Sequence, residues 1–365
     1  MSKFVKLGEI AELTVGFVGT MAQHYTENGI PFLRSLNIKP FEIYNGDMKY
    51  VSSDFNRKIA KSILHTDDVV IVRTGVPGTC CVVPEKYDGC NCSDVVIVRP
   101  KHELVNPHYL AAYVNFWGQK QISNNKVGAV QKHFNVRSAE QMLIFLPGRA
   151  EQERIGQFIK SLSGKIQTNN RINDNLQQMA YATYMHTFFG RKANGKLSDI
   201  LVENEKSTVQ VGEAKESAGE YPFFTSGDAI LRWSSAIVSS RNCFLNTGGN
   251  AGVKFYVGDA AYSTDTWCIT GTDGYADYLY LLLESLKPEL NLKFFQGTGL
   301  KHLQKPLLRD KLIYIPTESE IKSFNDAVQP WMTMISENVR QNQELISLRN
   351  WLLPMLMNGQ ATIND

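Results

Sequence analysis

The sequence predicts a mixed α/β (α+β) fold in which two similar domains are joined by two long helices packed as an antiparallel coiled coil. Three observations lead to this prediction. The chain contains a gapless internal repeat, each half holds short β-branched runs bounded by turn residues, and each half is followed by a long segment of helical periodicity. A chain of 365 residues has room for two domains of ordinary size and their connections.

The internal repeat runs from a Lys-His pair through a proline and a glutamate into a long helical segment. The matched positions are Lys132-His133 with Lys301-His302, Pro147 with Pro316, and Glu151 with Glu320. Weaker echoes link the beginnings of the two halves, and the loops between them differ in length and sequence. The sequence therefore predicts that one domain architecture, called the frame, occurs twice, with different residues in its loops, called the tips.

Residues 1–150 are predicted to form the first domain. Its expected buried strands are Val69–Val72, Val95–Val98 and Leu143–Leu146. The glycines and proline of Arg73–Gly78 indicate a loop between the first two strands. A helix is expected to begin at Asn106, because asparagine followed by proline is typical of a helix start.

Residues 151–190 are predicted to form the first spacer helix. Apolar or amide residues alternate at spacings of four and three along it, which is the pattern of a helix that packs against another helix. Gly190 stands where a helix C-terminal cap is expected. The residues expected to pack in this seam are Ile155, Ile159, Leu162, Ile166, Asn169 and Leu176.

The second half repeats this organisation. Residues 191–318 are predicted to form the second domain, residues 319–359 the second spacer helix, and residues 360–365 a C-terminal tail. Pro330 and Pro354 make the second helix less regular than the first. The residues expected in its seam are Phe324, Val328, Trp331, Ile335, Asn338 and Leu345.

Each predicted helix would leave an apolar stripe in water if it stood alone, and its copy is the nearest partner for that stripe. The intervening domain permits parallel or antiparallel packing. Asn169 and Asn338 lie near the midpoints of the two helices and would face each other in an antiparallel pair. Because a buried amide pair fixes register and orientation, the asparagines favour the antiparallel choice. The alternative is that both asparagines are simply solvated.

The composition excludes several classes of protein. With 43% hydrophobic and 20% charged residues, the chain has neither disorder-prone nor membrane composition. No apolar run is long enough to span a bilayer, and the N-terminus lacks the apolar core of a signal peptide, so we expect a cytoplasmic protein with no membrane partner. The spacing of the six cysteines is not that of a zinc site, and we expect buried, reduced thiols and no bound metal.

The net charge of +2 permits DNA binding without requiring it. Glycine-rich loops such as Arg73–Gly78 and Thr247–Gly252 lack the Gly-Lys-Ser/Thr ending of a nucleotide-binding loop, but their amides can hold a DNA phosphate. Arginines in or beside loops can read guanine edges, although each is also an ordinary surface charge. The candidate DNA-binding residues are Arg34, Arg73, Thr74, Lys132, His133, Arg232, Arg241, Lys301 and His302.

No catalytic residue is predicted. The carboxylates are scattered, the histidines lack metal-ligand spacing, and no nucleophile motif is present. Asn106-Pro107-His108-Tyr109 resembles the Asn-Pro-Pro-Tyr motif with which amino-methyltransferases hold a flipped adenine, but its third residue differs and no cofactor loop precedes it. We therefore interpret it as a helix start, and we expect no cofactor.

Together these features resemble the specificity (S, HsdS) subunit of a Type I restriction-modification system. The resemblance covers essentially the whole chain and rests on four segments. They are Ile30–Ile38, Asp67–Gly75, Val127–Phe134, and Leu146-Pro147 leading to Glu151–Ile155. The second half departs from the pattern, because Glu320-Ile321 stands where the first half has Glu151-Gln152.

The resemblance implies that each domain recognises a DNA target, that the two helices form an antiparallel spacer, and that the chain itself catalyses no reaction. It also implies binding to double-stranded DNA, to two methyltransferase (M) subunits, and through them to restriction (R) subunits. The alternatives are a specificity subunit of a fused, Type II-like system, a stand-alone DNA methyltransferase, and a coiled-coil adaptor. Binding of S-adenosylmethionine by the isolated chain would favour the methyltransferase. The absence of a salt-dependent affinity for DNA would favour the adaptor.

Overall fold

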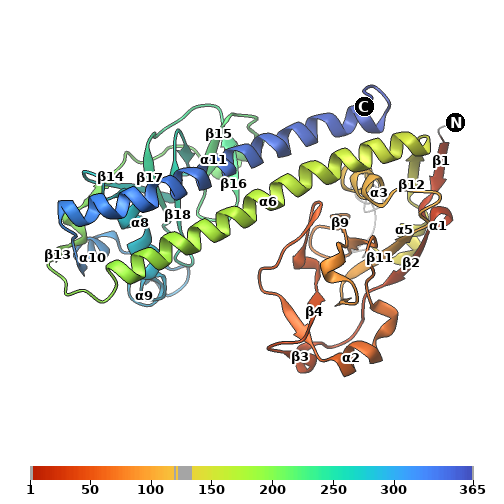
Figure 1. Cartoon of the computed structure of the whole chain (residues 1–365), viewed down its shortest axis with the longest axis horizontal. Helices are drawn as coiled ribbons and strands as arrows, with labels where there is room; N and C mark the ends of the chain where they lie inside the picture. The colour runs from red at the N-terminus through yellow and green to blue at the C-terminus, as the bar shows by residue number, and fades with distance from the viewer. Residues whose placement is uncertain (1–2, 119–120, 122–133, 364–365) are drawn as a thin grey trace. The chain divides into compact units, whose positions relative to one another are not determined.

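The computed structural model describes residues 3–118, 121 and 134–363. The chain divides into two compact units (Figure 1). The first consists of Met1–Gln167 with Leu345–Asp365, and the second of Thr168–Glu344. Each of the two long helices therefore contributes part of its length to each unit, so that the spacer segments expected from the sequence are shared between the units.

The first unit combines short strands with a few helical segments, the first part of α6 (Arg149–Thr187) and the last part of α11 (Glu318–Met357). Its strands are β1 (Lys3–Lys6), β2 (Ala11–Val15), β3 (Tyr25–Thr26), β4 (Ile30–Leu33), β5 (Ile38–Lys39), β6 (Glu42–Ile43), β7 (Lys49–Val51), β8 (Val69–Val72), β9 (Cys80–Val82), β10 (Asn91–Cys92), β11 (Val95–Pro100) and β12 (Leu143–Leu146). Its α-helices are α1 (Leu7–Ile10), α2 (Ser53–Lys58), α3 (Pro107–Tyr113), α5 (Val136–Glu140) and the start of α6 (Arg149–Thr187). Its shorter turns are η1 (Ala22–His24), η2 (Ser35–Asn37), η3 (Ala60–Ser62), η4 (Glu85–Tyr87) and η5 (Val114–Gly118).

The central sheet of the first unit has the strand order β2-β11-β8-β9, and all of its neighbours are antiparallel. β8 and β11 are buried along nearly their whole length, as their continuous β-branched runs predict. A second sheet has the order β10-β4-β7-β3, in which β4 and β10 are parallel. The strands expected at Val69–Val72, Val95–Val98 and Leu143–Leu146 are thus confirmed.

The second unit holds the remaining elements. Its strands are β13 (Gly195–Lys196), β14 (Leu201–Glu203), β15 (Tyr221–Phe224), β16 (Ile230–Trp233), β17 (Arg241–Asn246), β18 (Val253–Val257), β19 (Ala261–Tyr262), β20 (Thr266–Gly271), β21 (Phe295–Gln296), β22 (His302–Leu303) and β23 (Leu312–Ile313). Its helices and turns are η6 (Leu197–Asp199), α7 (Val211–Glu216), α8 (Ala276–Ser285), α9 (Lys287–Glu289), η7 (Leu290–Phe294), α10 (Lys305–Arg309) and the start of α11 (Glu318–Met357).

The two units repeat one topology, which confirms the internal repeat. The order β14-β20-β17-β18 matches β2-β11-β8-β9 strand for strand, and all neighbours are again antiparallel. The pair β13-β23 matches β1-β12, and the parallel pair β15-β19 matches β4-β10. The frame is therefore duplicated, while the connections between its strands differ.

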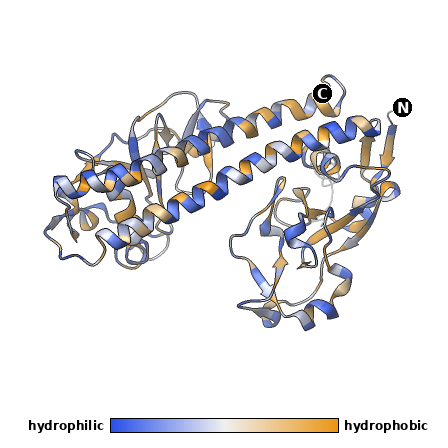
Figure 2. Cartoon of the chain, viewed as in Figure 1, coloured by the Kyte–Doolittle hydropathy of each residue, from blue (hydrophilic) through white to orange (hydrophobic). Residues whose placement is uncertain are grey.

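The two long helices are antiparallel, as predicted. In the first unit, Ile155 and Ile159 near the start of α6 share a hydrophobic cluster with Leu353 and Leu356 near the end of α11. In the second unit, the end of α6 (Ala180 to Thr187) and the start of α11 (Phe324 to Met332) share another cluster. Figure 2 shows polar and apolar residues alternating along both helices, which is the pattern of amphipathic packing.

The heptad seam is followed only in part. In α6 the expected residues Ile155, Ile159, Leu162, Ile166 and Asn169 are buried, whereas Leu176 is half-buried. In α11, Phe324 and Val328 are buried, Trp331, Ile335, Asn338 and Leu345 are half-buried, and Met332 and Asn342 are buried. An α-helix has 3.6 residues per turn, so a strict seven-residue pattern drifts off the contact face along a straight helix.

The expected pairing of Asn169 with Asn338 is wrong. The amide nitrogen of Asn169 donates to Oδ1 of Asn342 at 2.9 Å, and that of Asn338 donates to Oδ1 of Asn173 at 2.8 Å. Because Asn169 and Asn173 are the repeat counterparts of Asn338 and Asn342, these two bonds are equivalent. The helices are therefore offset so that Asn169 faces Asn342 and Asn173 faces Asn338.

The helix ends follow local sequence signals. Asn106 accepts a hydrogen bond from the backbone N–H of Tyr109 and Pro107 is the first residue of α3, which confirms the predicted helix start. Gly190 and Gly359 adopt positive φ of 79° and 74° just beyond the ends of α6 and α11. These left-handed positions suit glycine, which lacks the Cβ atom that makes them costly.

Two further findings concern the described residues. All six cysteines are buried and none forms a disulfide, as expected from the sequence. Among the helices that the structure describes, none is both long and apolar enough to cross a membrane.

Candidate functional site

The first unit presents a groove of about 380 Å³ where three strands begin or end. Arg34 directly follows β4, Arg73 and Thr74 directly follow β8, and Asp94 directly precedes β11. Ser93 and Asp94 line the groove together with these three residues. The structure therefore brings together three of the candidate DNA-binding residues of the first domain, Arg34, Arg73 and Thr74. It adds Ser93 and Asp94, which the sequence analysis did not select.

Strand pairing puts these residues at one edge. Val72, the last residue of β8, pairs with Val95, the first residue of β11, so Arg73 and Asp94 are neighbours. The backbone N–H of Arg73 donates to the carbonyl oxygen of Asp94 at 3.1 Å. The backbone N–H of Ser93 donates to the carbonyl oxygen of Leu33 at 2.9 Å, which connects this edge to β4.

The two arginines of the groove are held in different ways. Arg34 forms an ion pair with Asp47 at 2.9 Å, and its Nε is buried without a hydrogen-bond partner. Hydrogen bonds from Lys49 and Arg34 hold the pKa of Asp47 below its ordinary value. Arg73 donates from Nε to the carbonyl oxygen of Phe134 at 3.1 Å. Both guanidinium groups are thus oriented by fixed partners, as a recognition site requires.

Apolar and aromatic residues complete the groove. Phe17, Val18 and Tyr25 line it, and Val18 is 72% exposed. Burial raises the pKa of Tyr25 above its ordinary value, so its hydroxyl stays protonated at neutral pH and can donate a hydrogen bond. These residues come from segments distant in sequence from Arg73, and only the strand pairing shows that they share a surface.

The second unit assembles its candidate residues around the loop Thr247–Gly252. His302 pairs with Gly248 in an isolated antiparallel β-bridge. The backbone N–H of Gly249 donates to the carbonyl oxygen of Lys301 at 2.9 Å. Both lysine and histidine are exposed. The sequence selected this loop and the Lys301-His302 pair separately, and the structure places them side by side.

A corresponding contact occurs in the first unit. Lys132 and His133, the counterparts of Lys301 and His302, lie outside the described residues. The carbonyl oxygen of the next residue, Phe134, accepts a hydrogen bond from Nε of Arg73. The backbone N–H of its counterpart, Leu303, donates to the carbonyl oxygen of Thr247 at 2.9 Å, so the groups that bond differ between the units. In both units, the chain after the Lys-His pair therefore meets the end of the same central strand.

Arg232 and Arg241 lie elsewhere in the second unit. Arg232 is half-buried in β16, opposite Pro222 of β15. Arg241 begins β17, whereas the candidate loop follows the other end of that strand. Its Nε and Nη2 donate to the two carboxylate oxygens of Asp277 at 2.7 and 2.8 Å, and it also bonds to Thr333 of α11. The structure therefore gives Arg241 a structural partner in place of the expected free guanidinium.

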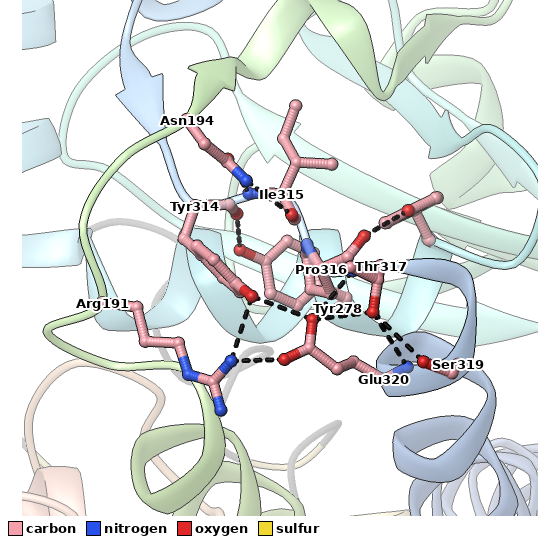
Figure 3. A network of polar contacts seen from close by, with 10 residues as sticks. Arg191, Asn194, Tyr278, Tyr314, Ile315, Pro316, Thr317, Ser319 and Glu320 are labelled. Carbon is pink, nitrogen blue, oxygen red and sulfur yellow. Dashed lines mark hydrogen bonds and ion pairs between the residues drawn. The ribbon is translucent and has the colours of Figure 1, made fainter.

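The start of α11 is fixed by a polar network around Glu320 (Figure 3). The Glu320 carboxylate accepts hydrogen bonds from the backbone N–H of Thr317 at 2.9 Å, from the Tyr314 hydroxyl at 2.8 Å, and from Arg191. These bonds, with that of Thr317 first, lower the pKa of Glu320 to about 2. The network ties the chain after α6 to the first turn of α11.

The difference between Gln152 and Ile321 has a structural explanation. The side chain of Gln152 donates to the carbonyl oxygen of Pro147 at 3.0 Å in the first unit. The corresponding carbonyl oxygen of Pro316 instead accepts from the Tyr275 hydroxyl at 2.6 Å. Since that oxygen is already satisfied, the position equivalent to Gln152 is free to be the buried Ile321.

No metal centre accompanies these sites in the part of the chain that the structure describes. Within residues 3–118, 121 and 134–363, no group of three or more histidine, cysteine, aspartate or glutamate residues is arranged to hold a metal ion. What the groove and the loop offer is a set of hydrogen-bond donors, acceptors and positive charges at strand ends. Such a set suits recognition of a polar, anionic ligand such as DNA.

Comparison with known proteins gives concordant results. Residues 2–178 match the family described as the Type I restriction modification DNA specificity domain. Over 88 residues, the chain is 31% identical to the Type I restriction enzyme MjaIX specificity subunit of Methanocaldococcus jannaschii, in an alignment that covers 24% of this chain and 20% of that protein. The chain thus spans about a fifth of the length of this curated relative.

One solved structure is similar over nearly the whole chain. The crystal structure of a Type I restriction-modification system S subunit from M. genitalium has a TM-score of 0.63 at 10% identity and covers 98% of this chain and 96% of that chain. The HsdS subunit from Thermoanaerobacter tengcongensis aligns over 99% of this chain and 97% of that chain, with 14% identity and a TM-score of 0.35. The likeness to the M. genitalium subunit shows a shared fold.

Proposed function

Residues 2–178 of the chain belong to the Type I restriction modification DNA specificity domain family, and from this premise we propose that the chain is the subunit that reads a bipartite, asymmetric DNA target. In this proposal each unit reads one half-site, and bases between the half-sites are not read. The chain catalyses no reaction itself. Methylation and cleavage reside in partner subunits.

One observation carries the proposal. The two units repeat the same strand order, yet they present different residues at the end of the same central strand. Arg73 stands at this place in the first unit, whereas Thr247 stands there in the second, beside the Lys301-His302 pair. The neighbouring strand carries an aspartate at the equivalent position of both units, Asp94 and Asp265. A duplicated frame with different tips supports recognition of two half-sites that differ in sequence.

The expected mode of binding follows from the residue types. Lysine side chains and backbone amides of the glycine-rich loops would contact phosphates and set the position of each unit. Arginine and aspartate side chains of the groove would read base edges. Two related units would place their half-sites about one helical turn, roughly 10 bp, apart.

We further propose that the chain assembles with two methyltransferase (M) subunits and, through them, with restriction (R) subunits in the cytoplasm. The family match and the shared fold support this assembly. The two long helices are candidate docking elements, because each contributes to both units. The spacer they form would also set the length of the unread gap.

The test is an exchange of one recognition domain. Residues 191–318 are replaced by the corresponding segment of another specificity subunit with a different target, and the methylated sites of the host genome are mapped before and after. The half-site read by the second unit is expected to change, while that read by the first stays the same. A change in both half-sites, or in neither, would contradict the proposal.

A further inference from the structure

Arg73 and Asp94 form a donor–acceptor pair at the edge of the first unit's groove. Their backbones are joined by the 3.1 Å hydrogen bond from the Arg73 N–H to the Asp94 carbonyl oxygen. Both side chains line the same groove of about 380 Å³. One residue carries only donors and the other, as a carboxylate, carries only acceptors.

The two side chains do not pair with each other. Asp94 is exposed, and within the described part of the chain its carboxylate forms no ion pair or hydrogen bond. Arg73 uses Nε to donate to Phe134, and among the described residues its two terminal nitrogens have no hydrogen-bond partner. Asp94 has a φ of 57°, and this left-handed backbone fixes the direction in which its side chain leaves the chain. An adjacent arginine and aspartate held apart in a groove can both face a ligand.

This pair is complementary to one base pair in particular. In the major groove, G·C presents two acceptors on guanine, N7 and O6, next to one donor, the N4 amino group of cytosine. An arginine fork matches the two acceptors, and a carboxylate matches the donor. An A·T pair presents only a single acceptor on adenine before its amino donor, so it offers the arginine fork one partner in place of two.

We infer that Arg73 and Asp94 together read a single G·C pair in the major groove, with Arg73 donating to guanine and Asp94 accepting from cytosine. This inference rests on the proposed function and specifies the contact that the first unit makes. Asp94 becomes a specificity-determining residue that the sequence did not reveal. Val18, exposed at the same groove, lies beside this contact.

The second unit provides an internal comparison. Strand register places Thr247 after Asn246, at the position that Arg73 occupies after Val72. Asp265 is the counterpart of Asp94, and its carbonyl oxygen accepts from the Thr247 hydroxyl at 2.8 Å. Because threonine has no guanidinium group, this position of the second unit cannot supply the arginine fork. The arginine–aspartate reading of G·C is therefore assigned to the first half-site alone.

The experiment uses the complex assembled with its methyltransferase subunits and short duplexes that carry the mapped target. In the wild-type complex, each guanine of the first half-site is replaced in turn by 7-deazaguanine, which lacks the N7 acceptor, or by hypoxanthine, which keeps both N7 and O6. One position is expected to lose about tenfold or more in methylation rate with 7-deazaguanine and little with hypoxanthine. This arm needs no protein variant.

The second arm uses Asp94→Asn, because asparagine also adopts a positive φ at little cost. Asp94→Asn and Arg73→Gln are each expected to reduce discrimination at that same base pair from about 10–100-fold to a few-fold. Discrimination at the second half-site should not change. Asp67→Asn is the matched control, because Asp67 has a φ of 69° in the same unit and does not line the groove.

The outcomes distinguish a failure of the G·C contact from a failure of the proposed function. If the wild-type complex methylates a bipartite target but neither 7-deazaguanine nor Asp94→Asn affects any position of the first half-site, the inference is overturned and the proposed function stands. If the wild-type complex shows no bipartite target, the proposed function itself fails. An effect of Asp94→Asn on the second half-site would also overturn the inference.

Discussion

Replacement of Arg241 by alanine is expected to destabilise the second unit strongly without altering which bases are read. Arg241 binds both carboxylate oxygens of Asp277, at 2.7 and 2.8 Å, and Asp277 has no exposed surface. The same guanidinium reaches Thr333 and the carbonyl oxygen of Gln329 in α11, both at 3.2 Å. The arginine thereby fastens the sheet of the second unit to its long helix.

The magnitude follows from the burial of Asp277. Removal of one partner of a buried pair leaves an uncompensated charge and typically costs about 3–5 kcal/mol. That is a large share of the roughly 5–15 kcal/mol that stabilises a typical folded domain. The double variant Arg241→Met with Asp277→Leu removes both charges and should recover most of the loss, because apolar residues often replace a buried pair at little cost.

Urea unfolding followed by circular dichroism measures the free energy of unfolding. Arg309→Ala is the matched control, since Arg309 pairs with Glu203 at 3.2 Å on the surface of the same unit, with exposures of 40% and 38%. This exposed pair should contribute less than about 1 kcal/mol. Equal effects of Arg241→Ala and Arg309→Ala would refute the reasoning. So would a changed methylation target in the stable double variant, because Arg241 would then contact DNA.

Two further predictions concern the long helices. Gly156→Ala should destabilise the first unit by about 1 kcal/mol or more, because the new Cβ would lie 2.3 Å from the Asn106 oxygen that caps α3. Gly164→Ala should instead stabilise this unit by about 0.5–1 kcal/mol, because its new Cβ would meet nothing within 4 Å. Thermal unfolding of both variants checks the opposite signs, and a shared sign would contradict the packing. Glu320→Gln should lower the melting temperature at neutral pH, and the difference from wild type should shrink as pH falls from about 4.5 towards 2. The reason is that the carboxylate stabilises the fold only while it is ionised, and its folded pKa is lowered to about 2. A difference that does not vary over this pH range would argue against the Thr317 and Arg191 contacts.

Local signals were sufficient to predict several buried strands and helix starts. β8 and β11 follow from uninterrupted β-branched runs, and the start of α3 follows from Asn106 with its proline, because each signal acts within a few residues. The pairing of α6 with α11 followed from two matching apolar stripes, and the asparagines near their midpoints favoured the antiparallel direction. The register of that packing did not, since the offset between two helices depends on how the whole units pack.

The candidate site was predicted less completely. Arg34 and Arg73 were selected because arginines in loops are common DNA contacts, but Asp94 and Tyr25 carry no comparable signal in the sequence. Arg241 has the same local appearance as Arg73, and only the buried Asp277 distinguishes their roles. Lys301 and the Thr247 loop were each selected, but their adjacency depends on β22.

The sequence by itself determined that this chain is a duplicated frame with two long helices, because periodicity and repetition are properties of residue order. The tertiary structure decided which charges remain available for a ligand. An arginine or aspartate becomes a reading residue or an internal tie according to the partner that packing brings to it, and that partner lies far away in the chain. Arg73 with Asp94 at the groove, and Arg241 with Asp277 in the interior, are the two results of that one physical rule.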